Sequence, residues 1–293
     1  MIQEPIKVRK NKNKNLKKRI DTYTILGIPY YFILATLIAL PMFLIIMYSI
    51  TMATDSIPFF KFTVDHFMKF FTHDVKFLQV LVNSLKFALI TTLITILIGY
   101  PFAFMITKFK SKTQALLILI ITVPMWINMF LRVIAWRQIL QKGGIVHKLL
   151  ALVGIEVGNL LGTDFAIIIG MVYVFLPFMI IPIYNVLNKI DPNLIQASKD
   201  LGANSFQTFK RVILPLSIPG VLSGVTMVML PSATTLVIPK YLGQGKLLIG
   251  NIIESQFIKS GDWNYGSAIS IILALVIILI TKLSNKLDKM REK

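Results

Sequence analysis

The chain has 293 residues, of which 55% are hydrophobic and 15% are charged, and its mean hydropathy is +0.73. A soluble domain of this length does not have so apolar a composition, so the chain is placed among membrane proteins. The absence of cysteine excludes disulfide bonds, thiolate metal sites and cysteine nucleophiles.

Residues 1–24 form a basic segment in which Lys and Arg alternate with Asn. Such a segment cannot bury a core, so we expect it to be disordered. We expect it to adhere to anionic inner-leaflet lipid, at about 1 kcal/mol per basic residue near the surface. The apolar segment that follows, 25–50, exceeds the roughly 7–15 residues of a signal-peptide core, which predicts an uncleaved first helix.

Long apolar segments predict an all-α polytopic membrane protein with about six transmembrane helices. Each segment is long enough to cross about 30 Å of hydrocarbon at ~1.5 Å per residue. The predicted spans are residues 25–50, 80–106, 114–136, 165–187, 212–231 and 267–284. Together they define a transmembrane domain over 25–285, followed by a basic tail over 286–293. Prolines within or beside most spans predict bent helices, whose free backbone groups either line a polar cavity or bond to neighbouring helices.

The third span carries polar residues in its second half. Trp126, Asn128 and Arg132 follow a run of apolar residues. An arginine deep in lipid costs about 2.5–3.5 kcal/mol or more, so Arg132 either faces the bundle interior or extends to the outer surface. The three residues are candidates for a translocation path, and the alternative roles are an interface anchor for Trp126 and a helix–helix hydrogen bond for Asn128.

The charges are distributed unequally between the two sides of the predicted membrane protein. With the N-terminus inside, the inner segments carry a net charge of +14 and the outer loops +2, out of +18 in total. This positive-inside pattern places both termini and the loop 188–211 in the cytoplasm. Because the charges sort by side, the net charge indicates membrane topology, and we expect no nucleic-acid partner.

The loop 188–211 is predicted to form two short helices. Asp191 is a favourable N-cap, Pro192 suits the first helical position, and Gly202 can end this helix in a left-handed turn. Ser205 can cap a second helix, which runs directly into the next span. From the pattern alone, the pair is equally consistent with a solvated connector and with a docking site for a partner.

Catalytic and metal-binding patterns are weak. The segment 240–246 resembles a nucleotide-binding loop but has Lys240 in place of the first glycine and Leu247 in place of Ser or Thr. The three histidines, at 66, 73 and 147, lack metal-ligand spacing. We therefore expect no catalytic residue, no bound cofactor and no metal in this chain, so that ATP and magnesium would bind to a separate polypeptide.

The helix pair resembles the cytoplasmic coupling motif of ABC-importer permeases, which is Glu-Ala-Ala, three residues, Gly, nine residues, Ile, one residue, Leu-Pro. The matching residues are Gln196, Ala197, Ser198, Gly202, Val212, Leu214 and Pro215. Gln196, Ser198 and Val212 depart from the motif in residue type, while the spacing is the same throughout. The resemblance implies that Gln196, Ala197, Ser198, Asp200, Gly202 and Pro215 couple the chain to an ATPase.

Five further segments resemble the spermidine/putrescine ABC-transporter permeases. They are Gly99–Ala103, Val123–Asn128 with Arg132, Leu176–Met179, Leu247–Asn251, and Asp262–Trp263 with Gly266. The resemblance implies a pore built with a second permease, two cytoplasmic ATPase subunits and an extracytoplasmic polyamine-binding protein. It also implies that an outer loop containing Glu254 and Asp262 receives the binding protein.

One observation does not fit a polycationic cargo, because none of the six predicted spans contains Asp or Glu. Acids of the partner chain could complete the route. The nearest alternative is therefore a permease of the same architecture for an amino acid, thiamine, ferric ion or an anion. A self-contained secondary transporter would be expected to show an inverted repeat or an intramembrane ionisable relay, and neither is visible. A membrane-anchored scaffold would leave most of the spans unexplained.

Overall fold

The computed structural model describes residues 22–53, 60–72, 75–155 and 158–289. The chain divides into two units, residues 1–47 and 48–293, which are described separately. In the first unit, α1 (Thr22–Leu34) continues through a π-helical turn, η1 (Ala35–Ala39), into α2 (Leu40–Ser49). Most of its large apolar side chains are exposed, including Leu37 at 70%. An apolar helix with this exposure suits lipid.

The second unit begins with a small hairpin and three helices. Strands β1 (Thr51–Ala53) and β2 (Phe60–Phe62) pair antiparallel, with Met52 opposite Lys61. They are followed by α3 (Asp65–Thr72), the long α4 (Val75–Ile106) and α5 (Ser111–Trp126). The hairpin is a small addition to a fold that is otherwise helical, as the sequence predicted.

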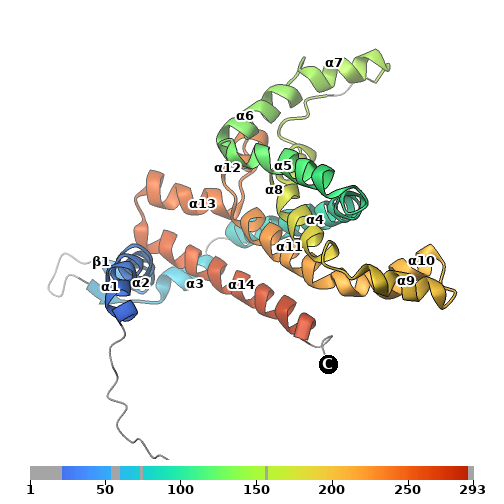
Figure 1. Cartoon of the computed structure of the whole chain (residues 1–293). Helices are drawn as coiled ribbons and strands as arrows, with labels where there is room; N and C mark the ends of the chain where they lie inside the picture. The colour runs from blue at the N-terminus through green and yellow to red at the C-terminus, as the bar shows by residue number, and fades with distance from the viewer. Residues whose placement is uncertain (1–21, 54–59, 73–74, 156–157, 290–293) are drawn as a thin grey trace, which may run out of the picture. The chain divides into compact units, whose positions relative to one another are not determined.

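The remaining elements are all helical (Figure 1). They are α6 (Met129–Leu140), α7 (Ile145–Leu152), α8 (Asp164–Leu187), α9 (Pro192–Asp200), α10 (Ser205–Thr208), η2 (Phe209–Ile213), α11 (Leu214–Thr234), α12 (Val237–Leu242), α13 (Ile249–Ser255), η3 (Gln256–Ser260) and α14 (Trp263–Lys289). Five segments among the described residues are long and apolar enough to cross a membrane: Pro29–Ser49, Phe77–Ile106, Asp164–Leu187, Ser205–Thr234 and Trp263–Lys282.

The third predicted span, 114–136, differs from the structure. Helix α5 ends at Trp126, α6 begins at Met129, and the two segments meet at an angle of 93°. Pro124 has no N–H to donate to the preceding turn, and the Ile127 N–H bonds back to the Pro124 carbonyl at 3.3 Å. Asn128 then caps α6 with its side chain. The sequence pattern predicts one continuous span because both halves are apolar.

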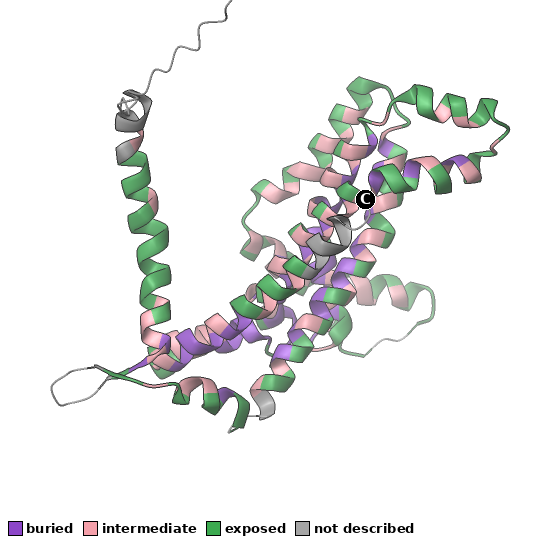
Figure 2. Cartoon of the chain, turned by 90° about the horizontal axis from the view of Figure 1, so that it is seen from below, coloured by how far each residue is buried: buried purple, intermediate pink, exposed green. Residues whose placement is uncertain are grey.

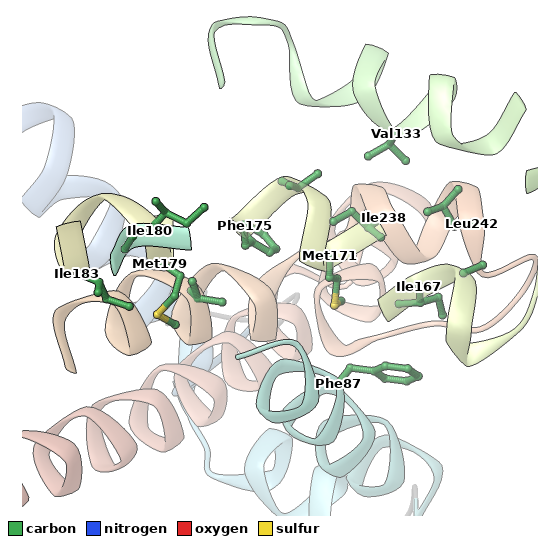
Figure 3. Close-up of a cluster of buried hydrophobic side chains, with 14 of the residues drawn as sticks. Phe87, Val133, Ile167, Met171, Phe175, Met179, Ile180, Ile183, Ile238 and Leu242 are labelled. Carbon is green, nitrogen blue, oxygen red and sulfur yellow. The ribbon is translucent and has the colours of Figure 1, made fainter. Parts of the chain in front are cut away.

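Helices α4, α8 and α11 pack together as the core of the second unit. Residues of α8 supply much of the buried apolar cluster, including Ile167, Met171, Phe175 and Met179 (Figure 3). Gly224 of α11 approaches α8 so closely that a Cβ would lie 2.6 Å from the Met179 sulfur. Small residues at such contacts bring membrane helices together, because van der Waals packing is a main source of their association.

A second buried cluster joins α3 and α4 to α13 and α14. It contains Phe70, Leu81, Ile249, Ile252, Tyr265, Ile269, Ile272 and Leu273. Outside these two clusters, long helical faces are exposed (Figure 2). Because these faces are apolar, they suit contact with lipid or with another membrane helix.

Both predicted tails lie largely outside the described residues. Of the basic segment 1–24, only residues 22–24 are described, and they begin α1. Of the tail 286–293, residues 286–289 continue α14, and the rest is outside the description.

Candidate functional site

The first helix of the predicted pair forms as the sequence indicated. The Asp191 carboxylate accepts a hydrogen bond from the Asn193 N–H at 2.9 Å, and Pro192 is the first residue of α9. Gly202 adopts a left-handed conformation with φ of +83°. The Gly202 N–H donates to the Lys199 carbonyl at 2.8 Å and the Ala203 N–H to Ser198 at 3.1 Å. This is the Schellman arrangement, in which glycine is strongly preferred at the left-handed position.

The second helix is capped by a residue that the sequence analysis did not select. The prediction of Ser205 was wrong, because Asn204 caps α10 and Ser205 is the first helical residue. The Asn204 side chain accepts from the Gln207 N–H, and the Gln207 side chain accepts from the Asn204 N–H, each at 2.9 Å. This reciprocal capping box was detectable from the glutamine three residues after the asparagine.

A hydrogen bond joins the two helices, and they enclose a groove. The hydroxyls of Ser198 and Thr208 lie 3.0 Å apart and form a hydrogen bond. The groove has a volume of about 430 Å³. Its lining residues are Leu194, Ala197, Ser198, Leu201, Gly202, Ala203, Gln207, Arg211 and Val212. Two apolar side chains of the pair extend into solvent, Leu201 at 88% and Phe206 at 70% exposure.

The predicted coupling residues therefore fall into two groups. Ala197, Ser198 and Gly202 line the groove. Gln196 and Asp200 are exposed on α9 outside its lining, and Pro215 is exposed in the first turn of α11. In Figure 1 the pair lies at the joined ends of α8 and α11. Any partner that binds this pair is thus attached directly to two of the three core helices.

An aromatic cluster links the helix pair to the third core helix, α4. Phe209, at the start of η2, packs edge-on against Tyr100 and Phe104, with ring centroids 5.9 and 5.6 Å apart. The Tyr100 hydroxyl also bonds to the Ser217 hydroxyl at 2.8 Å. Each aromatic pair contributes about 0.5–1.5 kcal/mol beyond its buried area. The facing rings are more than one hundred residues away in the chain, so no local sequence pattern predicts these contacts.

The three candidate path residues surround the break between α5 and α6. Trp126 is 81% exposed at the end of α5. The side-chain amide oxygen of Asn128 accepts a hydrogen bond from the Phe130 N–H at 2.8 Å, so Asn128 caps α6. Arg132 is half-buried, and within the described part of the chain its Nε has no hydrogen-bond partner.

Among the described residues, the segments predicted to lie on the outer side contain two ion pairs. The Lys240 ammonium lies 2.7 Å from the Glu254 carboxylate, and Lys246 pairs with Asp164. The hydrogen bond to Glu254 is the main cause that raises the pKa of Lys240. Asp262, the second expected contact for a binding protein, accepts from the Tyr265 N–H at 3.0 Å at the start of α14. Its carboxylate therefore has a local role as a cap.

Comparison with known proteins places this arrangement in a family. Residues 22–290 match the pattern of the binding-protein-dependent transport system inner membrane components. The chain belongs to this family. It is accordingly a permease subunit and a multi-pass membrane protein, and the resemblance noted in the sequence is confirmed.

Two relatives are similar to this permease over most of both chains. The spermidine/putrescine transport system permease protein PotB of Haemophilus influenzae is 41% identical over 234 residues, 78% of this chain and 81% of its own. PotB of Escherichia coli K12 is 38% identical over 222 residues, 75% of this chain and 80% of its own.

The permease also has the fold of solved transporter structures. It superposes on a chain of a bacterial alginate ABC transporter, in complex with an alginate-bound periplasmic protein, with a TM-score of 0.78. The match covers 93% of this chain and 96% of the other at 18% identity. A methionine ABC transporter in an inward-facing conformation matches 73% of this chain and 95% of its own, with a TM-score of 0.55 and 17% identity. These likenesses establish the all-α permease fold.

Proposed function

We propose that this chain is the membrane-spanning permease subunit of an ATP-driven importer of polyamines such as spermidine and putrescine. The observation that carries the proposal is its 41% and 38% identity to two spermidine/putrescine permeases, over at least three quarters of the chain. At this level of similarity, the cargo of the relatives is a better guide to the cargo of this chain than the absence of acids in the predicted spans. That absence favoured other cargoes.

The α9–α10 pair is the proposed docking site for a cytoplasmic ATPase. It presents a groove lined by Ala197, Ser198 and Gly202, and two exposed apolar side chains that a partner can cover. Closure of the ATPase on ATP would move the pair, and its attachments to α8, α11 and α4 would transmit the movement to the core. This is alternating access driven by another polypeptide, so ATP and magnesium bind to the ATPase.

The proposed assembly contains a second related permease, two ATPase subunits and an extracytoplasmic polyamine-binding protein. The exposed apolar faces of this chain support contact with lipid and with the second permease. The charge distribution supports cytoplasmic termini and an α9–α10 pair on the cytoplasmic side. The outer segment between α12 and α14, with Glu254 and Asp262, faces the binding protein in this orientation. Trp126, Asn128 and Arg132 would border the route, with Trp126 offering its ring face to cargo ammonium groups.

The deciding experiment is uptake of radiolabelled spermidine by vesicles that contain this chain and the products of its neighbouring genes. Uptake is measured with and without ATP, beside vesicles that lack only this chain. We expect uptake that requires both ATP and this chain. No uptake by an assembled complex with active ATPase would contradict the polyamine cargo and favour another solute for the same architecture.

A further inference from the structure

A cavity of about 370 Å³ lies between the end of α11, the helix α13 and the outer half of α14. Its lining residues are Thr234, Leu236, Gly250, Ile253, Glu254, Ser270, Leu273, Ala274 and Ile277. Ser270 to Ile277 belong to the last apolar span, Trp263–Lys282. Glu254 therefore lies beside a membrane span, although it is not part of one in the sequence.

Short backbone contacts hold α13 in this position. A Cβ on Gly250 would lie 2.5 Å from the Thr234 carbonyl oxygen, so only glycine permits this approach of α13 to α11. The Asn251 side chain donates to the Leu236 carbonyl, and the Ile249 N–H donates to the Ser84 hydroxyl, each at 2.8 Å. These bonds fix the helix that carries Glu254 at the edge of the cavity.

The cavity has the chemistry of a site for an alkylammonium group. Among the described residues that line it, Glu254 is the one charged residue. The Ser270 hydroxyl donates to the Gly266 carbonyl at 2.8 Å and Thr234 donates to Leu230 at 3.2 Å, so both oxygens retain lone pairs for an incoming donor. The remaining lining side chains are apolar and suit a methylene chain.

The Lys240 side chain already presents this chemistry to Glu254. Its ammonium lies 2.7 Å from the Glu254 carboxylate, with the two side chains 43% and 24% exposed. A lysine side chain is an ammonium on a chain of methylene groups, and a linear polyamine likewise carries ammonium groups joined by short methylene chains. Because the pair is partly exposed, its net stabilisation is small and another ammonium can compete for the carboxylate.

We propose that the Glu254 cavity is a polyamine subsite, in which an ammonium of the cargo displaces the Lys240 ammonium from the Glu254 carboxylate. The inference rests on the proposed function. It identifies Glu254 as the group of this chain that binds an ammonium of the cargo. It accounts for a polycationic cargo in a protein whose sequence-predicted spans contain no acid, because the acid is supplied by α13 as it packs against α14.

The test is equilibrium binding of radiolabelled spermidine to the purified transporter complex without its binding protein. The complex is held in nanodiscs of neutral phosphatidylcholine, so that lipid does not bind the cation. Glu254→Gln keeps the shape and removes the charge, and we expect it to weaken binding about tenfold, as for loss of one charge-assisted hydrogen bond. Lys240→Gln removes the competing ammonium and should tighten binding. Asp164→Asn breaks the other outer ion pair and is the matched control, with binding unchanged.

A structural role for the pair predicts a different pattern. If Lys240 and Glu254 only join α12 to α13, Lys240→Gln would weaken binding as much as Glu254→Gln, and the exchange Lys240→Glu with Glu254→Lys would restore it. Either result would overturn the subsite, as would equal binding by Glu254→Gln and wild type. If the wild-type complex takes up spermidine and the Glu254→Gln variant binds spermidine as tightly as wild type, the subsite proposal is wrong and the proposed function stands. A wild-type complex that takes up no spermidine contradicts both.

Discussion

At the residue scale, Gly202 shows how a single backbone angle can determine the shape of the α9–α10 pair. Its φ of +83° lets the chain reverse between α9 and α10, and no other atom lies near the position that a Cβ would occupy. A substitution there is strained by the backbone alone, at roughly 1–2 kcal/mol and more for a β-branched residue. Such a strain would displace the helix pair without affecting the buried core.

We expect Gly202→Val to leave the permease inserted and at normal abundance, and to lower ATP-driven uptake at least several-fold. Stimulation of ATP hydrolysis by the cargo-loaded binding protein should also be lost, because the displaced pair would no longer present its groove to the ATPase. Gly143→Val is the matched control, because Gly143 has a φ of +75° and equally open surroundings outside the pair. Normal uptake by Gly202→Val at normal abundance would remove the coupling role from this turn.

At the residue scale, the ring of Trp126 is also available for contact, because it is 81% exposed on this chain. If it borders the route, Trp126→Ala should reduce spermidine uptake several-fold without changing assembly, and Trp126→Phe should retain more activity because it keeps a ring face. Both are measured as initial uptake rates, normalised to the amount of assembled complex. Unchanged uptake by the alanine variant would instead identify Trp126 as a lipid anchor.

At the scale of elements, two aromatic residues of one short segment have different surroundings. Phe206 is exposed on α10, whereas Phe209, three residues later, packs against Tyr100 and Phe104 of α4. The π-helical turn η2 carries Phe209 and runs without a break into α11. A movement of the pair would therefore act on α11 through the backbone and on α4 through the aromatic rings.

Two alanine variants should distinguish these roles. Phe206→Ala should weaken co-purification of the ATPase, because it removes an apolar side chain from the docking surface. Phe209→Ala should retain the ATPase but lower the uptake per ATP hydrolysed, because two ring contacts are lost. The assays are co-purification and the ratio of transport to hydrolysis. Identical defects in both variants would contradict this division.

At the scale of the whole molecule, the chain has more apolar surface than one protein in water can expose. Exposed helix faces carry residues such as Leu97 and Leu279, at 74% and 69% exposure. Lipid and a second permease are the surroundings that suit such faces. The proposed orientation of the chain in the membrane rests on the distribution of its charges, which fits the positive-inside pattern.

The orientation can be measured directly because the natural chain contains no cysteine. We expect Lys199→Cys, in α9, to react with a membrane-impermeant maleimide only after the cells are permeabilised. Lys142→Cys, between α6 and α7, should react in intact cells. Both residues are exposed in the structure, so a lack of labelling cannot be attributed to burial. The reverse labelling pattern would invert the proposed topology.

The sequence by itself determined the membrane class, the helical fold and the turn at Gly202, because hydropathy, charge and capping are local properties. It also held the signals for the Asn204 cap and, at Pro124, for the break after α5. Only the tertiary structure brought Phe209 against α4 and Glu254 against α14. These contacts join residues far apart in the chain, and their positions depend on how helices pack, which no local pattern encodes.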